Sequence, residues 1–122
     1  MIVIAIISII AAIGTVNFRR SRARAQYTAC ASNVKNIGTA CEMYSKDNNG
    51  RYPQNTTQLT AGGFIKALPT CPSVGFSTYA NGYGAASNPD VYTLVCAGTN
   101  HSGADIAANY PQYTARSGLV EQ

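Results

Sequence analysis

Residues 1–18 read MIVIAIISIIAAIGTVNF, and this stretch decides the fold of the chain. Seven of the first thirteen residues are isoleucine, Ser8 is the only one of them with a polar side chain, and no charge appears before Arg19. Thirteen residues form about 20 Å of helix, whereas a bilayer core is about 30 Å thick. Residues 1–13 are therefore too short to span a membrane alone, and they are apolar on every side, which the surface of a soluble domain does not tolerate.

This apolar run requires partners. Burial of its isoleucines at ~1.5–3 kcal/mol each contributes about 10–20 kcal/mol before entropy costs. The run lacks the basic stretch that precedes the apolar region of a secretory signal. Three interpretations remain open: a helix buried inside an assembly, the second half of a longer membrane helix, or both at different times. The side chains expected in the core of an assembly are Met1, Ile2, Val3, Ile4, Ile6, Ile7, Ile9, Ile10 and Ile13.

Positive charge is concentrated directly after the apolar run. The net charge is +4, and Arg19, Arg20, Arg22 and Arg24 supply four of the nine basic residues, which leaves the remainder neutral. A nucleic-acid-binding domain needs a basic face on its folded part, so we expect no specific nucleic-acid partner. We divide the chain into an apolar assembly or membrane helix with a basic collar, residues 1–25, and a globular head, residues 26–122.

Helical periodicity continues beyond this collar. No proline and only one glycine occur between Phe18 and Asn48, and apolar residues recur there at spacings of three and four, as in an amphipathic helix. We expect one helix from near Met1 to about Asp47, ended by KDNNGRYP, residues 46–53. The stripe expected to face a sheet consists of Tyr27, Cys30, Val34, Ile37, Cys41 and Tyr44.

Short elements are predicted for the rest of the head. NTTQLTAGGF, residues 55–64, predicts one short helical turn with Asn55 as its N-cap and Gly62 as its stop. FSTYANGYG, residues 76–84, and DVYTLVCAG, residues 90–98, are β-rich runs, and residues 110–120 add a third strand or an ordered tail. A long N-terminal helix packed against a small antiparallel sheet is an α+β fold.

The opening MIVIAIISIIAAI, followed by Arg, Ala and a small helix-on-sheet domain, resembles the type IV pilin superfamily, which includes bacterial type IV pilins and the pseudopilins of type II secretion systems. NVKNIGTACEMYSKDNNGRYP, residues 33–53, LPTCP, residues 68–72, and NYPQYT, residues 109–114, are similar to pseudopilin-like members. Processed members begin with a methylated Phe in a stretch like FTLIEL, directly before the equivalent of Met1. The resemblance therefore predicts that the first residues of the mature chain are missing here.

The resemblance implies a structural subunit of an extracellular, type IV pilus-like helical filament that polymerises through its apolar helix. The implied partners are copies of the same chain, the inner membrane before assembly, and the pilus or secretion assembly machinery. A major pseudopilin of a type II secretion system is the first alternative, and a membrane-tethered binding protein is the second. We do not expect an enzyme, because one histidine and five scattered acidic residues form no evident site.

The four cysteines leave two disulfide schemes open. Cys30 and Cys41 lie about 16 Å apart along one helix, whereas a disulfide needs Cα atoms within about 7 Å. Either Cys71 bonds Cys96 while the helix thiols stay buried as small hydrophobic groups, or two bridges join the helix to the sheet. We favour the Cys71–Cys96 disulfide. No pair has CxxC spacing, which argues against zinc.

No cofactor is expected from the sequence. His101 lies in GTNHSGAD, residues 98–105, where we expect a solvated loop residue. Asp90 and Asp105, with nearby carbonyls, provide the one metal alternative, a calcium site, because calcium prefers oxygen ligands.

Overall fold

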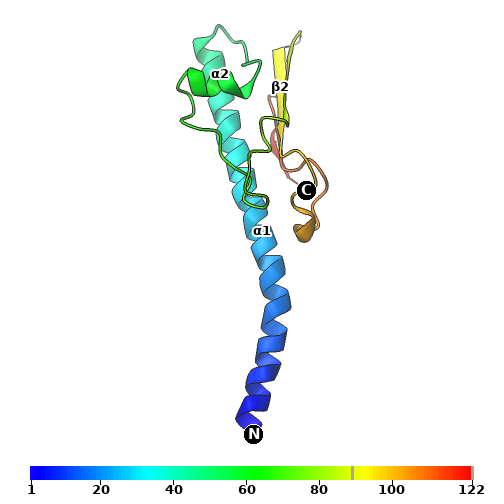
Figure 1. Ribbon diagram of the computed structural model, residues 1–122. Coiled ribbons are helices and arrows are strands. Elements are labelled where there is room, and N and C mark those ends of the chain that lie inside the picture. The colour runs from blue at the N-terminus through cyan, green and yellow to red at the C-terminus, as the bar shows by residue number, and fades with distance from the viewer. Residues whose placement is uncertain (89, 122) are drawn as a thin grey trace.

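Figure 1 shows the computed structural model of the chain, which describes residues 1–88 and 90–121 and, within them, every side chain except those of residues 15 and 16. One helix, α1 (Ile2–Asp47), runs the length of the molecule. Its N-terminal part projects away from the rest of the chain, and its C-terminal part packs against most of the other elements. The predicted helix from near Met1 to about Asp47 is confirmed.

α1 ends where the sequence predicted, and local hydrogen bonds and turn residues account for this end. The Asn48 amide donates to the carbonyls of Tyr44 and Ser45, and the Gly50 amide also donates to Ser45. Asn49 and Gly50 then take φ angles of 58° and 81°, a left-handed conformation that Asn and Gly adopt more readily than other residues. The chain therefore turns back over the helix instead of continuing it.

The short helix α2 (Thr56–Ala61) also follows the prediction. The Asn55 side chain accepts a hydrogen bond from the Gln58 amide at 3.1 Å, which satisfies one of the free donors of the first turn. Gly62 is the C-cap residue.

Four strands form one antiparallel meander: β1 (Tyr83–Ser87), β2 (Asp90–Val95), β3 (Gln112–Thr114) and β4 (Gly118–Val120). Leu94 of β2 pairs with Tyr83 on one side and Tyr113 on the other. A 3₁₀ turn, η1 (Ser102–Ala104), lies between β2 and β3 and packs against α1. A long N-terminal helix against a small antiparallel sheet is the predicted α+β, pilin-like layout.

Two of the predicted strand segments differ in detail. The strand expected within residues 76–84 begins only at Tyr83, because Thr78 and Tyr79 turn inward and are buried. A Cβ on Gly82 would lie 2.1 Å from the Val95 carbonyl oxygen, so only glycine allows the two backbones to approach there. Residues 110–120 form two paired strands instead of one.

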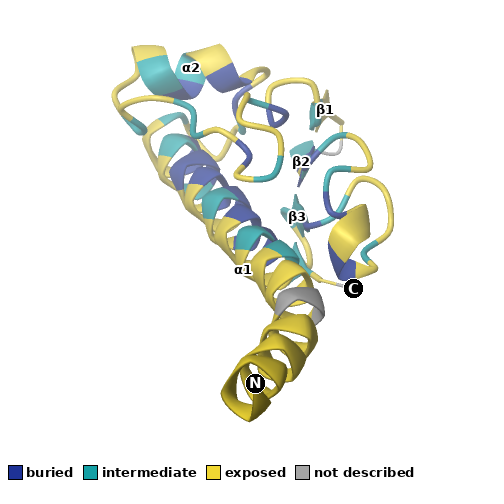
Figure 2. Ribbon diagram, turned by 60° about the horizontal axis from the view of Figure 1, so that its bottom comes forward, coloured by how far each residue is buried: buried dark blue, intermediate teal, exposed yellow. Residues whose placement is uncertain are grey.

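The core lies between one face of α1 and the sheet with its loops (Figure 2). Opposite the helix, Leu59, Tyr79, Tyr92 and Leu94 are fully buried. Of the stripe residues, Cys30, Val34, Ile37 and Cys41 are fully buried, Tyr27 is at the edge of the core, and Tyr44 is half-buried.

The sheet approaches α1 most closely at Gly38. The Tyr92 hydroxyl donates to the Gly38 carbonyl at 3.2 Å and to Glu42 Oε1 at 3.1 Å. The Tyr113 ring stacks on Tyr92 with ring centroids 6.2 Å apart, and its atoms would lie 2.7–2.8 Å from a Cβ added at Gly38. Position 38 therefore leaves no room for a side chain while Tyr113 keeps its place.

The head leaves the large apolar side chains at the start of α1 exposed. The large apolar residues from Met1 to Ile13 are between 52% and 102% exposed, and Phe18 is 69% exposed. Within the described residues, one 18-residue window of α1 has a mean hydropathy of 2.1, with none of it buried, and is apolar and long enough to cross a membrane. The helix thus continues the apolar run past residue 13, which lengthens the segment available for a membrane or an assembly.

We predict that Gly38→Ala destabilises the head. Alanine gains ~1 kcal/mol of helix propensity, but displacing the packed Tyr113 ring costs about 1–3 kcal/mol. The expected net loss of ~1 kcal/mol lowers the Tm by about 4–8 °C in thermal unfolding of the full chain in detergent. Thr39→Ala, on the exposed side of the same turn, is the matched control and should leave the Tm nearly unchanged. Equal or higher stability of Gly38→Ala would contradict this packing.

Candidate metal centre

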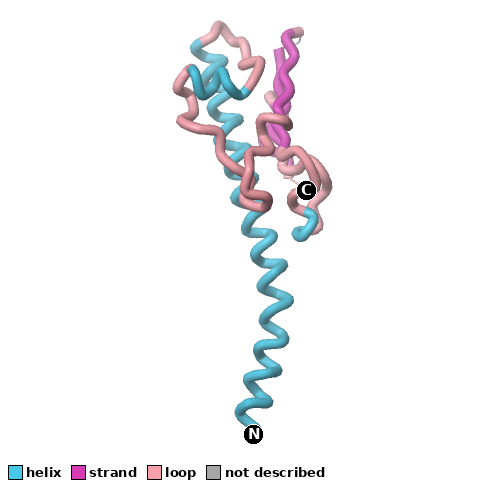
Figure 3. The backbone as a smooth tube through the Cα atoms, viewed as in Figure 1, coloured by secondary structure: helices cyan, strands magenta, loops and turns pink. Residues whose placement is uncertain are grey.

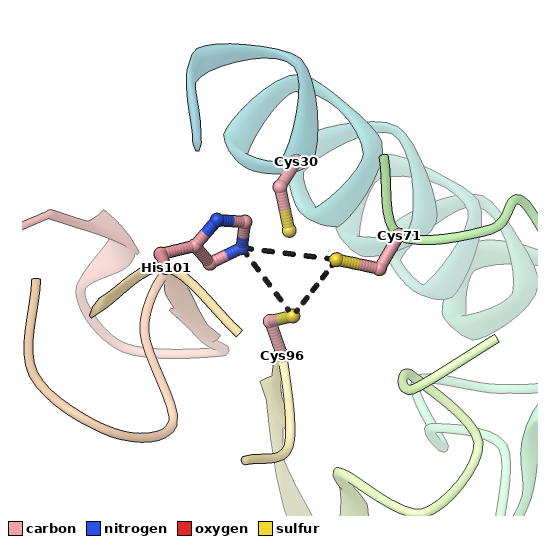
Figure 4. Close-up of side chains that lie close together, drawn as sticks. All are labelled: Cys30, Cys71, Cys96 and His101. Atoms are coloured by element: carbon pink, nitrogen blue, oxygen red, sulfur yellow. Dashed lines mark hydrogen bonds between the residues drawn. The ribbon is translucent and has the colours of Figure 1, made fainter. Parts of the chain in front are cut away.

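Four buried side chains from three separate segments converge beside α1 (Figure 4). Cys30 comes from α1, Cys71 from the connection between α2 and β1, Cys96 from the residue after β2, and His101 from the residue before η1. The three cysteines have no exposed surface, and His101 is 4% exposed. Their sulfur and ring-nitrogen atoms all lie within 4.8 Å of one another, so this group could hold a metal ion.

Cys71, Cys96 and His101 form a triangle of short distances. The Cys71 and Cys96 sulfurs are 3.7 Å apart. His101 Nε2 lies 3.6 Å from the Cys96 sulfur and 3.8 Å from the Cys71 sulfur. These contacts are drawn as a triangle in Figure 4, with the Cys30 sulfur on its helix side.

Tight backbone turns place Cys71 and His101. The Cys71 amide donates to the Phe76 carbonyl, and the Cys71 carbonyl accepts from the Gly75 amide at 2.8 Å, which closes a small loop around this residue. The His101 carbonyl accepts from the Ala104 amide in the 3₁₀ turn. His101 Nδ1 lies 3.0 Å from Ser73 Oγ, and this contact orients the ring so that Nε2 faces the sulfurs.

Cys96 and Cys30 receive further polar contacts from outside the group. Thr78 Oγ1 lies 3.2 Å from the Cys96 sulfur, and Asn100 Nδ2 donates to the same sulfur at 3.3 Å. Tyr79 Oη lies 3.2 Å from the Cys30 sulfur. Hydrogen bonding from Cys30, followed by that from Thr78, Asn100 and His101, lowers the pKa of Cys96 to about 4, against the effect of burial. Negative charge in the group is therefore stabilised most strongly on Cys96.

The expectation that His101 is a solvated loop residue is wrong. Residues 96–101 leave β2 and return to α1, where the imidazole packs edge-on against Tyr27, with ring centroids 5.4 Å apart and planes at 76°. Glycines and polar residues dominate this segment in the sequence, so nothing local indicates that it is folded inward.

The predicted disulfide is not present, although its two cysteines lie side by side. All four cysteines are free thiols, and 3.7 Å between the Cys71 and Cys96 sulfurs is well beyond a bond of about 2.05 Å. The argument against a metal, based on the lack of CxxC spacing, also fails, because three of the four ligand atoms come from segments far apart in the chain. Cys41 is buried as well but lies outside the group, next to Tyr83.

The calcium alternative at Asp90 and Asp105 is wrong. Asp90 accepts a hydrogen bond from the Tyr52 amide, beyond the C-terminal end of α1. Asp105 pairs with Arg20 at 3.1 Å, on a part of α1 that lies about 40 Å of helix before that end. The two carboxylates therefore occupy opposite ends of the head and cannot share an ion.

No family model matches the chain, and no curated protein sequence or solved structure is significantly similar to it. The resemblance to the type IV pilin superfamily thus remains a prediction from the sequence.

We predict that the chain, purified without reductant, releases four reactive thiols when it is unfolded and almost none when it is folded, because all four sulfurs are buried. Titration with a chromogenic disulfide reagent, with and without denaturant, measures both numbers. Cys41→Ser should yield three thiols after unfolding and thereby calibrates the count. Two thiols from the unfolded wild-type chain would mean that a disulfide forms.

Proposed function

We propose that this protein is a structural subunit of an extracellular helical filament, in which the first half of α1 packs against the same segment of neighbouring copies. One observation carries the proposal: the large apolar residues from Met1 to Ile13 are all more than half exposed on a helix that projects away from its own head. Such a segment is stable only in lipid or against other apolar helices.

The head is suited to lie on the outside of such a filament, around the packed helices. Its own core is complete without the projecting segment, because the buried residues begin at Tyr27 and the residues that pack with the core cluster all lie between residues 30 and 119. Removing the projecting segment from water thus requires no rearrangement of the head. When one face of this segment contacts a different face of the same segment in a neighbouring copy, the interface is heterologous. Such interfaces produce an open helical assembly unless the rotation closes a ring.

The same segment would hold the subunit in a membrane before it assembles. The apolar 18-residue window of α1 is close to the ~20 residues that a bilayer requires. The collar arginines begin at Arg19, where the helix would leave the hydrocarbon. Among the described residues, the one ion pair formed by a collar arginine is that between Arg20 and Asp105. Both side chains are well exposed, so this ion pair contributes little to stability.

We predict that Ile6→Asp abolishes filament formation while the head stays folded. The carboxylate would have to be buried among apolar helices, which is costly without a partner. Met43→Asp is the matched control, because Met43 lies on the same helix and is also 52% exposed, but it belongs to the head. Electron microscopy of detergent-depleted protein measures filaments, and the Tm in detergent measures folding.

Filaments from Met43→Asp and none from Ile6→Asp, with similar Tm values, are the expected result. Normal filaments from Ile6→Asp would contradict the proposal. A wild-type chain that forms only short filaments would favour the pseudopilin alternative, and one that remains monomeric in lipid would favour a membrane-tethered protein.

A further inference from the structure

We propose that Cys30, Cys71, Cys96 and His101 bind one Zn²⁺ ion in a closed tetrahedral site that fastens the irregular part of the head to α1. This role is separate from filament assembly, since it concerns the folding of each subunit.

The spacing of the ligand atoms is that of a tetrahedral zinc site. Zn–S bonds of about 2.3 Å and Zn–N bonds of about 2.0–2.1 Å, at tetrahedral angles, place two sulfurs about 3.8 Å apart and a sulfur and a nitrogen about 3.6 Å apart. The structure has 3.7 Å between the Cys71 and Cys96 sulfurs and 3.6 and 3.8 Å between these sulfurs and His101 Nε2. The Cys30 sulfur is the fourth corner, within 4.8 Å of the other three ligand atoms.

The donor set selects the metal. Three sulfurs and one imidazole nitrogen form one of the common structural zinc sets, whereas calcium and magnesium require oxygen ligands. All four protein ligands are buried, which leaves no open position for water or a substrate. This is the arrangement of a structural site and not of a catalytic one.

The surrounding polar groups match the charge of such a site. Three thiolates, one neutral imidazole and a Zn²⁺ ion carry a net charge of −1, and any proton still held by a ligand thiol is released to solvent when the ion binds. Hydroxyl or amide groups of Thr78, Tyr79 and Asn100 lie 3.2–3.3 Å from the sulfurs and can donate to them. Coordination through His101 Nε2 leaves the proton on Nδ1, which can donate to Ser73 Oγ. Contacts of this kind fix the ligands of metal sites.

The site lies where the head has little regular structure to hold it. The connection between α2 and β1, residues 62–82, contains no helix or strand and lies along α1 (Figure 3). Connections of this length without elements of their own are uncommon in a compact domain. A zinc ion would tie this connection, through Cys71, to α1 through Cys30 and to the segment after β2 through Cys96 and His101. A Cys71–Cys96 disulfide would join only two of these segments and would not connect either of them to α1 through Cys30.

The test measures metal content of the full chain, purified in detergent without chelator or reductant. We expect one Zn²⁺ per chain by mass spectrometry of metals. We also expect Co²⁺ to replace it, with the visible bands of tetrahedral cobalt and thiolate charge-transfer bands. Cys30→Ser and Cys41→Ser form a matched pair, because both cysteines are fully buried on α1 and only Cys30 belongs to the group. Cys41→Ser should keep one zinc, and Cys30→Ser should bind it at least ~10-fold more weakly.

Two further measurements separate metal binding from a general loss of folding. A strong chelator should lower the Tm of the wild-type chain and of Cys41→Ser by more than about 10 °C, and addition of Zn²⁺ should restore it. His101→Cys keeps four ligands and should retain the ion, with the cobalt charge-transfer absorption increased by the fourth thiolate. Wild-type protein with less than about one zinc in ten chains, no cobalt spectrum and no response to chelator would overturn the proposal, whether its thiols are free or paired. Retention of zinc by Cys30→Ser at wild-type affinity would also overturn it.

Discussion

The contact between one face of α1 and the sheet with its loops is the interaction on which the rest of the structure depends. That face provides Cys30, Val34, Ile37 and Cys41 to a single core, and none of the strands is longer than six residues. A sheet of this size is only marginally stable alone. The helix therefore organises the head, and the same helix, continued without a break toward Met1, presents an apolar surface that the head does not cover.

These two halves of α1 lead to two different proposals. The large apolar side chains of the first half, from Met1 to Ile13 and at Phe18, are exposed on the single subunit and require lipid or other copies. The second half carries Cys30, which brings a helix, an irregular connection and the end of a strand to one point. A site of that kind would hold the head on the helix independently of its neighbours, so the subunit would be folded before it assembles.

Much of the fold could be predicted from the sequence because its signals are local. The helix bounds follow from an uninterrupted periodicity and from Asn49–Gly50, and the bounds of α2 follow from Asn55 and Gly62. The buried group could not be predicted in this way, because Cys30, Cys71 and Cys96 lie 41 and 25 residues apart and only the final packing brings them together. His101, five residues after Cys96, is the one local signal, and a count of all cysteine and histidine residues as a possible ligand set would have found it. The strand at Tyr83 was placed too early because Thr78 and Tyr79, which precede it, are buried in the core from a turn and not from a strand.

A helical reconstruction of the assembled protein by electron microscopy tests the central claim most directly, because it locates residues 2–18 relative to the filament axis. The account predicts a central bundle in which these residues are covered by the same segment of neighbouring subunits, with the heads outside. Subunits joined through their heads, with the apolar segments directed outward or folded back onto their own subunit, would contradict it.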